Sequence, residues 1–477
     1  LGNSWNKYYE LTLSVYKELA EVEYLNGNFE KSEELINVIL DNAKSDIEKA
    51  DAYRLLIIQY TLSAKYTEAI SVLRKVMIVL NLELPREEDY KVVIENEMNT
   101  IKTRLLNKKV ETLVNEPEVT DPEKKIAIKL LTISMPTSYY SSPELWTVLV
   151  LKTVNLYLSF GNVGETYGYS CYGILMAAYG DFKSGYEFGK LAVTISEKFN
   201  NKSEKCKGSN VFANLIHSWV YHIKNTIEIN ADGFNAGLES GEFQHASYTL
   251  MNASVNLFFM GKTVKQVQTD IAKMLQFTQK VQSNVASDMI IGVDLITKSL
   301  QSSMSDHEFD FFKEDEKYLK VCSANQSMMS ICIYKIMKSQ VLFLYSNLDI
   351  AYKEIMDSSS MLSFIVVLHP VAEHNFYYSL ILCALYKDAG KEDRLKYMTQ
   401  IKINQKQMKI WAESCAENFL HKYLLVEAEI ARIEYKNWKA AKLYDESILE
   451  ARKNDFTQDE ALANELAAKF WLKTKNY

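Results

Sequence analysis

The chain has 477 residues, of which 16 are Gly and 6 are Pro, and its formal net charge is −7 at pH 7. A β-sandwich or barrel of this length needs many tight turns made from Gly and Pro, and a doubly wound nucleotide-binding fold needs a Gly-rich first turn, so both classes are disfavoured. The hydrophobic and charged fractions, 48% and 24%, are those of a globular protein, and we expect helices joined by short polar turns.

The first predicted helical block covers residues 1–115. Apolar residues recur every three or four positions over residues 11–25, and the same helical period returns over residues 35–39. The segment between them, residues 27–32, reads GNFEKS. A Gly can adopt the left-handed conformation that ends a helix, an aromatic residue can wedge between two helices, and a small residue one turn later lets their backbones approach. The segment therefore predicts a helix-turn-helix unit.

This turn pattern recurs along the whole chain. Its further copies are 64–69 (AKYTEA), 180–185 (GDFKSG), 241–246 (GEFQHA), 347–351 (NLDIA) and 436–441 (KNWKAA). Paired helices joined by such a turn are typical of tetratricopeptide (TPR) repeats, whose period is about 34 residues. The sequence therefore predicts an all-α fold, a TPR-like antiparallel helix-pair solenoid that curves into a superhelix and presents a concave groove.

The prolines mark a boundary after the first block. Four of the six are Pro117, Pro122, Pro136 and Pro143. Because a proline disfavours helical conformation in the residue before it, we expect a bent, Pro-rich connector at residues 116–145.

The remainder of the chain is predicted to form two further TPR-like blocks, a middle block at residues 146–305 and a C-terminal block at residues 306–477. Within the middle block, residues 200–209 read as a polar loop between helix pairs. Residues 302–320 mix Ser, Asp and Glu with Phe, and this composition leaves a loop and a charged helix open as alternatives.

One predicted helix, at residues 211–230, offers a candidate binding surface. Its apolar residues step by four and should face the core; they are Leu215, Trp219, Ile223 and Ile227. The polar residues His217, Tyr221 and Asn225 then lie on another face. We interpret these three residues as a candidate site for a protein or peptide bound in the concave groove. Ordinary solvated helix surface is the alternative.

No catalytic, cofactor-binding or metal-binding residues are predicted. Residues 185–191 (GYEFGKL) superficially resemble a phosphate-binding loop, but three residues separate the glycines where four are required, and a leucine stands where Ser or Thr would hold magnesium. His217 and His222 are five positions apart, as are His369 and His374. Two zinc ligands on one helical face need a step of three or four, so neither pair predicts a metal site.

Charge and cysteine spacing narrow the partners and the compartment. Basic and acidic residues are interspersed and no basic stripe is visible, so nucleic acid is not an expected partner. The longest weakly polar stretch, residues 361–368, is far shorter than the roughly 20 residues of a membrane span. The six cysteines lie at least ten positions apart, which is typical of free thiols in a cytoplasmic protein. The chain starts with Leu1 rather than Met, and we expect it to be a segment of a longer protein.

Several longer phrases resemble a known family. They are Trp5, 9–16 (YELTLSVY), 20–21 (AE), 27–30 (GNFE), 81–85 (NLELP), 157–162 (YLSFGN), 167–169 (YGY), 185–189 (GYEFG), 237–242 (GLESGE), 417–423 (ENFLHKY) and 460–467 (EALANELA). These phrases resemble the helical-repeat region of large multidomain signalling proteins. In that family the region follows a protein-kinase-like domain and an AAA or STAND-type ATPase, and it precedes GAF and histidine-kinase modules.

The resemblance implies a regulatory role. In the family, nucleotide binding, kinase activity and the phosphorylated His belong to flanking domains, so we expect this segment to be a non-catalytic regulatory or sensory scaffold. Its implied partners are the flanking ATPase, kinase and GAF domains of the parent chain. The alternative is a stand-alone TPR-type adaptor for a peptide or protein, in the manner of quorum-sensing repeat proteins. A third hypothesis, an enzyme with an unrecognised site, has no residue constellation in its favour.

Overall fold

The computed structural model describes residues 4–63, 65–301 and 311–474. The regular secondary structure within these ranges is helical, apart from one isolated bridge between Glu118 and Asn162. The predicted all-α helical-repeat fold is therefore confirmed. None of the described helices combines the length and the apolar composition that crossing a lipid bilayer requires.

Internal contacts divide the chain into two compact units. Unit 1 comprises residues 1–175 and 187–204, and unit 2 comprises residues 176–186 and 205–477. Helices α9 and α10 each contribute to both units. The helices up to α10 are α1 (Ser4–Lys7), α2 (Tyr9–Leu25), α3 (Phe29–Asn42), α4 (Asp46–Leu62), α5 (Tyr66–Val79), α6 (Tyr90–Leu105), α7 (Pro122–Ser141), α8 (Pro143–Phe160), α9 (Tyr167–Ala178) and α10 (Phe182–Lys198).

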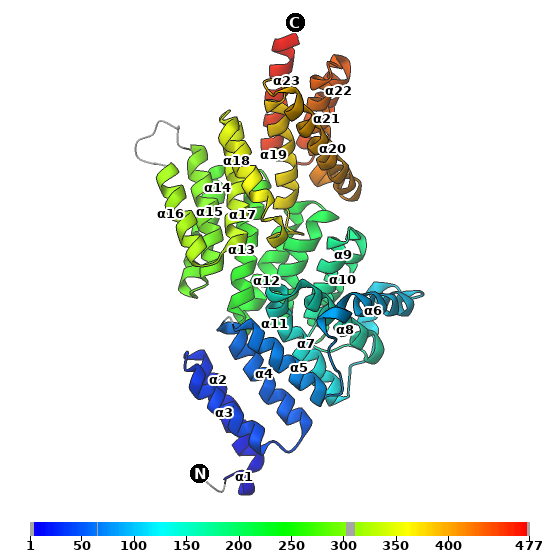
Figure 1. Ribbon diagram of the computed structural model, residues 1–477, viewed down its shortest axis with the longest axis vertical. Helices are drawn as coiled ribbons and strands as arrows, with labels where there is room; N and C mark the ends of the chain where they lie inside the picture. The colour runs from blue at the N-terminus through cyan, green and yellow to red at the C-terminus, as the bar shows by residue number, and fades with distance from the viewer. Residues whose placement is uncertain (1–3, 64, 302–310, 475–477) are drawn as a thin grey trace. The chain divides into compact units, whose positions relative to one another are not determined.

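Unit 2 holds most of the remaining helices. They are α11 (Lys202–Val211), which begins in unit 1, then α12 (Thr226–Ser240), α13 (Phe243–Phe259), α14 (Val264–Lys280), α15 (Asn284–Gln301), α16 (Phe311–Ala324), α17 (Met328–Leu344), α18 (Leu348–Ser359), α19 (Pro370–Leu385), α20 (Lys391–Ser414), α21 (Ala416–Ile433), α22 (Asn437–Lys453) and α23 (Thr457–Thr474). Consecutive helices pack as neighbours in both units: α2 with α3, α4 with α5, α12 with α13 and α21 with α22 (Figure 1).

The recurrent turn has one backbone geometry. In all six copies the residue that precedes the second helix donates its N–H to the carbonyl five residues earlier, as in the bond from Asn28 to Glu23 and that from Lys436 to Ala431. The residue before it has a left-handed backbone conformation. At Gly27 the φ angle is 82°, and at Tyr435 it is 58°. This is the Schellman end of a helix. The turn thus forms at copies with and without Gly.

The small residue is the constant feature of the helix pairs. It is almost fully buried at Ser32, Ala69, Ala246 and Ala351, and in the last copy at Ala440, one position before the predicted Ala441. Ser32 also donates its hydroxyl to the carbonyl of Ala20 on the facing helix, at 2.8 Å. The absence of a long side chain at this position lets the two backbones approach.

The aromatic wedge is less constant than we predicted. Phe243 is 47% exposed, and Trp438 is 87% exposed. The prediction for Trp438 is wrong. The alignment of the turns places Lys436 at the left-handed position, but in the structure this position is taken by Tyr435, one residue earlier. Helix α22 therefore begins at Asn437, and Trp438 points away from α21 into solvent.

The Pro-rich connector, which was predicted as irregular, is largely helical. The expected connector at residues 116–145 contains the whole of α7, with Pro136 inside it. Pro122 and Pro143 occupy the first positions of α7 and α8, where a missing N–H is tolerated, and Asp121 and Ser142 cap the two helices. The connector prediction missed that these prolines start helices.

The other two predicted interruptions have different outcomes. The polar loop expected at residues 200–209 is largely helix α11. Of the segment at residues 302–320, positions 302–310 lie outside the described residues, and α16 begins at Phe311. The block boundaries at residues 115, 145 and 305 stay a prediction.

Candidate functional site

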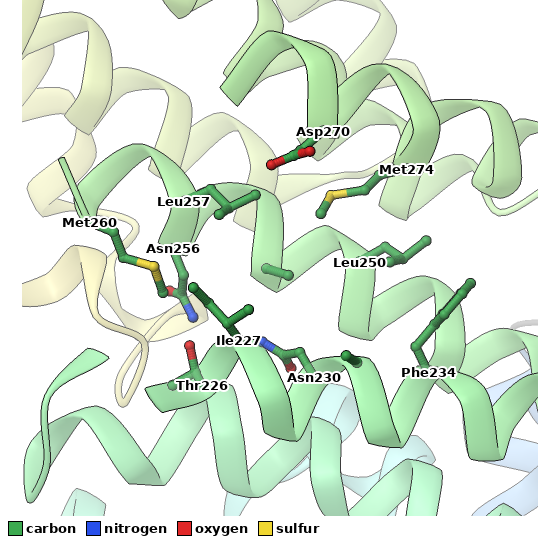
Figure 2. Close-up of a pocket in the computed structure, with 12 residues that line it drawn as sticks. Thr226, Ile227, Asn230, Phe234, Leu250, Asn256, Leu257, Met260, Asp270 and Met274 are labelled. Atoms are coloured by element: carbon green, nitrogen blue, oxygen red, sulfur yellow. The ribbon is translucent and has the colours of Figure 1, made fainter. Parts of the chain in front are cut away.

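Helices α12, α13 and α14 enclose a hollow of about 280 Å³ (Figure 2). Apolar side chains supply most of its lining, and one of them, Ile227, is 42% exposed. The lining residues are Thr226, Ile227, Asn230, Ala231, Phe234, Leu250, Ala253, Asn256, Leu257, Met260, Asp270 and Met274. A concave apolar surface with few polar groups is the usual form of a binding site.

A cluster of buried asparagines lies behind the hollow. Asn214 and Asn230 exchange side-chain hydrogen bonds, with nitrogen to oxygen distances of 2.8 and 3.1 Å. Asn256 donates to the Asn214 oxygen at 2.9 Å, and Asn252 donates to the Asn210 oxygen at 3.3 Å. All five side chains are at most 6% exposed. Because the amides pair with one another, their hydrogen bonds offset the cost of burying them, and Asn214 links Asn230 of α12 to Asn256 of α13.

The chemistry of the hollow follows from its lining. Asn230 and Asn256 present amides from the cluster, and the carboxylate of Asp270 lies on the exposed side of α14. Among the lining residues, Thr226 and Asp270 carry the other polar side chains, and the Thr226 hydroxyl donates to the carbonyl of Ile223 at 2.7 Å. The arrangement suits an apolar side chain of a peptide or protein segment.

The predicted helix at residues 211–230 is wrong as one continuous element. After α11 ends at Val211, residues 212–216 form a π turn, residues 217–219 a short 3₁₀ turn and residues 223–225 another, before α12 begins at Thr226. A bend interrupts the periodicity at His222, whose Nδ1 accepts the backbone N–H of Lys224 at 3.0 Å.

This break changes which residues face the core. Trp219 and Ile223 are buried as predicted, but Ile227 is half exposed and lines the hollow. Sequence periodicity assumes a constant 100° step per residue, and the π and 3₁₀ turns do not keep that step. The fourth apolar position therefore lies on a surface rather than in the core.

The predicted binding residues are only partly brought together. His217 is 5% exposed, and its ring lies 5.5 Å from that of Tyr221 and 5.7 Å from that of Tyr186. Tyr221 is 45% exposed, and Asn225 lies exposed at the end of a 3₁₀ turn. None of the three lines the hollow. Binding by His217, Tyr221 and Asn225 stays a prediction.

Burial gives His217 a distinct pH response. It lowers the pKa of His217 to about 4, below the value of about 6.5 in an unfolded chain. The unfolded state therefore binds more protons below pH 6.5, and stability falls as the pH falls toward 4. We expect His217→Phe to remove about 1–2 kcal/mol of the stability loss between pH 7 and pH 5. Urea unfolding at the two pH values measures this difference, and an identical loss in wild type and variant would contradict it.

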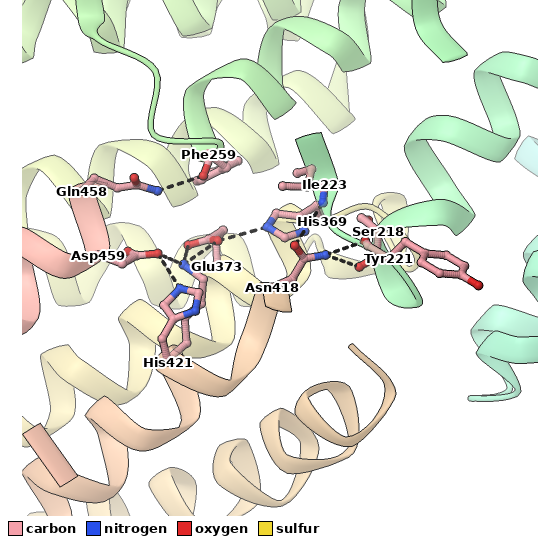
Figure 3. Close-up of polar contacts among 11 residues, drawn as sticks. Ser218, Tyr221, Ile223, Phe259, His369, Glu373, Asn418, His421, Gln458 and Asp459 are labelled. Atoms are coloured by element: carbon pink, nitrogen blue, oxygen red, sulfur yellow. Dashed lines mark hydrogen bonds and ion pairs between the residues drawn. The ribbon is translucent and has the colours of Figure 1, made fainter. Parts of the chain in front are cut away.

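A second polar cluster, formed by charged residues, lies among α19, α21 and α23 (Figure 3). The Lys422 ammonium is 3.0 Å from a Glu373 oxygen and 2.7 Å from an Asp459 oxygen. His421 contacts the same Asp459 oxygen at 2.9 Å, and His369 contacts Glu373 at 3.2 Å. These five side chains are at most 3% exposed. We call them the Lys422 cluster.

Electrostatics favour the charged forms of Lys422 and Asp459. Burial on its own raises the pKa of Asp459, but Lys422 and His421 outweigh burial and hold that pKa well below its ordinary value. Burial lowers the pKa of His421 more than Asp459 raises it. For Lys422, the two carboxylates outweigh burial and raise the pKa of the ammonium. The cluster therefore holds three helices together by paired charges that water does not reach.

Asn418 lies one turn before Lys422 on α21 and forms hydrogen bonds to the irregular segment after α11, residues 212–225. Its side-chain nitrogen donates to the carbonyls of Ser218 at 2.7 Å and Tyr221 at 3.0 Å, and its oxygen accepts the N–H of Ile223 at 3.1 Å (Figure 3). These bonds satisfy backbone groups that the π and 3₁₀ turns leave without helical partners. The distorted segment is thus held by residues about 200 positions further along the chain.

Sequence reasoning missed the Lys422 cluster and Asn418 as structural residues. The signal available was the phrase at residues 417–423, which carries the family resemblance and contains Asn418, His421 and Lys422. Nothing near this phrase supplies their partners, because Glu373 and Asp459 lie 49 and 37 positions away. Within the described residues, no group of three or more His, Cys, Asp or Glu side chains is arranged to hold a metal ion.

Comparison with known proteins gives one similarity to report. No protein-family model matches the chain. In an alignment of 282 residues that covers 54% of the chain, the chain is 22% identical to hybrid signal transduction histidine kinase G of Dictyostelium discoideum. The match covers 8% of that protein, so the chain spans a small part of the relative's length.

Proposed function

We propose that this chain is a non-catalytic helical-repeat scaffold, a segment of a larger multidomain signalling protein, which regulates an attached ATPase or kinase through protein contacts. The observation that carries the proposal is the similarity to hybrid signal transduction histidine kinase G, which involves 54% of this chain and 8% of that kinase. Because the matched region is a small part of that kinase, we interpret this chain as one regulatory segment among several domains.

Two structural features support a binding role. The hollow on α12, α13 and α14 offers an apolar surface with two amides behind it, and the asparagine cluster makes that surface rigid before a partner arrives. A preformed surface binds more tightly because less conformational entropy is lost on association. In the proposal, a segment of a GAF, kinase or ATPase domain inserts an apolar side chain there.

A cytoplasmic location is part of the proposal. All six cysteines are buried and free, and thiols that are not paired in disulfides suit a reducing compartment.

A stand-alone adaptor for a peptide or protein is the second candidate function, and the preformed hollow favours it equally. The two candidates differ in what surrounds the segment. An open reading frame that extends beyond both Leu1 and Tyr477 supports the scaffold. An initiating Met directly before Leu1 together with a stop after Tyr477 would replace it with the adaptor.

The proposal is tested in the full-length protein with a matched pair of substitutions on α12. Ile227 and Leu238 are both 42% exposed, but only Ile227 lines the hollow. We expect Ile227→Asp to change nucleotide hydrolysis or phosphotransfer by roughly 30-fold, since an energetically important contact residue contributes about 2 kcal/mol. Leu238→Asp should leave both rates unchanged.

The isolated chain provides the second measurement. We expect it to show no hydrolysis of ATP and no incorporation of phosphate, with or without the Ile227→Asp substitution. Equal effects of Ile227→Asp and Leu238→Asp in the full-length protein would remove the hollow from the proposal, and ATP hydrolysis by the isolated chain would overturn its non-catalytic character.

A further inference from the structure

Helix α2 carries an exposed apolar face. Leu11, Val15, Leu19, Val22 and Leu25 are between 42% and 68% exposed. The opposite side of the helix packs inward, where Leu13, Ala20 and Tyr24 are buried against α3 and α4. These five exposed residues therefore lie on one side of a helix whose other side is already packed.

The spacing of the exposed row is that of a coiled-coil seam. Leu11, Val15, Glu18, Val22 and Leu25 follow one another at alternating steps of four and three. In heptad terms, Val occupies the a positions and Leu the outer d positions, a pattern typical of helices that pair side by side. The face therefore suits a partner helix rather than a flat surface or a small ligand.

The charges around the seam select the partner. Glu18 occupies the central d position of the seam itself and is exposed. Glu10 is exposed and Glu21 is half exposed on one flank. Lys7 is exposed at the start of the face, whereas Lys17 is paired with Asp51 on the inner side, at 2.8 Å.

A second copy of this chain fits the seam poorly. In a parallel pair, d positions face each other, so Glu18 would meet the same carboxylate of its partner. In an antiparallel pair Glu18 would face Val15, and its charge would be buried without a counter-charge. Both arrangements are unfavourable because a desolvated, unpaired carboxylate destabilises an interface.

We propose that the outer face of α2 binds a basic amphipathic helix of another protein segment, with Lys or Arg placed opposite Glu18. Its apolar seam covers Leu11, Val15, Val22 and Leu25, and its flanking basic residues face Glu10 and Glu21. This surface is separate from the hollow on α12, α13 and α14, and the inference does not depend on the function proposed for that hollow.

The test uses two synthetic helical peptides of about three heptads, with Ile at a and Leu at d. One carries Lys at the central d position and along both flanks, and the other carries Glu at the same places. Fluorescence anisotropy with the full chain should show the basic peptide binding at least about tenfold more tightly, the effect of one close charge pair in a desolvated seam.

Substitutions on the protein separate charge selection from apolar burial. Glu18→Lys should reverse the preference between the two peptides, and Val15→Ser with Val22→Ser should abolish binding of both. Val92→Ser on α6, at a position 60% exposed, is the control and should change nothing. All these side chains are exposed, and circular dichroism melting checks that each variant is folded.

Three results would overturn the inference. Equal affinity for both peptides, or a preference that Glu18→Lys leaves unchanged, would show that charge does not select the partner. A dimer of the chain in sedimentation that Val15→Ser dissolves would instead identify a second copy as the occupant.

Discussion

Replacing Lys422 with alanine is expected to lower the free energy of unfolding by about 3–5 kcal/mol, the effect of removing one partner from a buried ion pair. Lys422 is 1% exposed, and its ammonium lies between the carboxylates of Glu373 and Asp459. Without it, two buried carboxylates keep only the contacts to His369 and His421. Their repulsion and their lost hydration are then uncompensated.

A surface lysine provides the matched control for this substitution. Lys436 pairs with Glu434 at 2.7 Å, but the two side chains are 59% and 37% exposed. Solvent screens such a pair, so Lys436→Ala should change stability by less than about 1 kcal/mol. Urea unfolding monitored by circular dichroism measures both variants. The prediction is wrong if Lys422→Ala destabilises no more than Lys436→Ala.

The Lys422 variant should also respond to acid differently. In the folded wild type the pKa of Asp459 is lowered. The charged carboxylate therefore stabilises the fold above the unfolded-state pKa of about 4, and this stabilisation is lost as the pH falls through the lower pKa of the folded state. Without Lys422, burial raises the pKa of Asp459, and the carboxyl becomes neutral at a higher pH. The stability gap between wild type and variant should therefore narrow below about pH 4.

Trp219→Ala is expected to destabilise the fold by about 3–5 kcal/mol, as other large truncations in packed cores do. The Trp219 ring is 2% exposed and lies 5.5 Å from the ring of Phe419 and 5.4 Å from that of Trp411. Its Nε1–H donates to the carbonyl of Val367 at 2.8 Å. The substitution opens a cavity among these rings and leaves that carbonyl without its donor.

Two further tryptophan variants separate packing from hydrogen bonding. Trp219→Phe keeps a ring in the cavity and should lose about 1–2 kcal/mol, mainly the hydrogen bond to Val367. Trp438→Ala is the control, because Trp438 is 87% exposed and its removal should change stability by less than about 0.5 kcal/mol. Urea midpoints that rank Trp438→Ala with Trp219→Ala would refute the assignment of Trp219 to the core.

The predictions from local pattern were the most successful. The repeated turn could be recognised in the amino-acid sequence because its Schellman hydrogen bond joins residues only five positions apart, such as Asn28 and Glu23. The small residue after it, such as Ser32 or Ala246, was identified for the correct packing reason. Even here Trp438 was placed one residue out of register, because the turn geometry at Tyr435 needs no Gly.

Predictions that assumed a regular helix or a regular break were weaker. The connector at residues 116–145 was expected from its prolines, but a proline at the first position of α7 or α8 favours a helix rather than ending one. The prediction of one helix at residues 211–230 did not consider that hydrogen bonds from Asn418 can satisfy the backbone N–H and C=O groups of a distorted segment. Of the candidate residues, His217 is consequently buried while Tyr221 and Asn225 are exposed.

The amino-acid sequence alone was sufficient for the all-α class and for the positions of the helix turns, since these depend on contacts between residues within about two helical turns of each other. The Lys422 cluster, the asparagine cluster and the hollow beside it depend on the packed structure. A buried charge or amide is stable only when its partner is present, and the partners of Lys422 lie 37 and 49 positions away. Only the packing of the helices brings such groups within hydrogen-bonding distance.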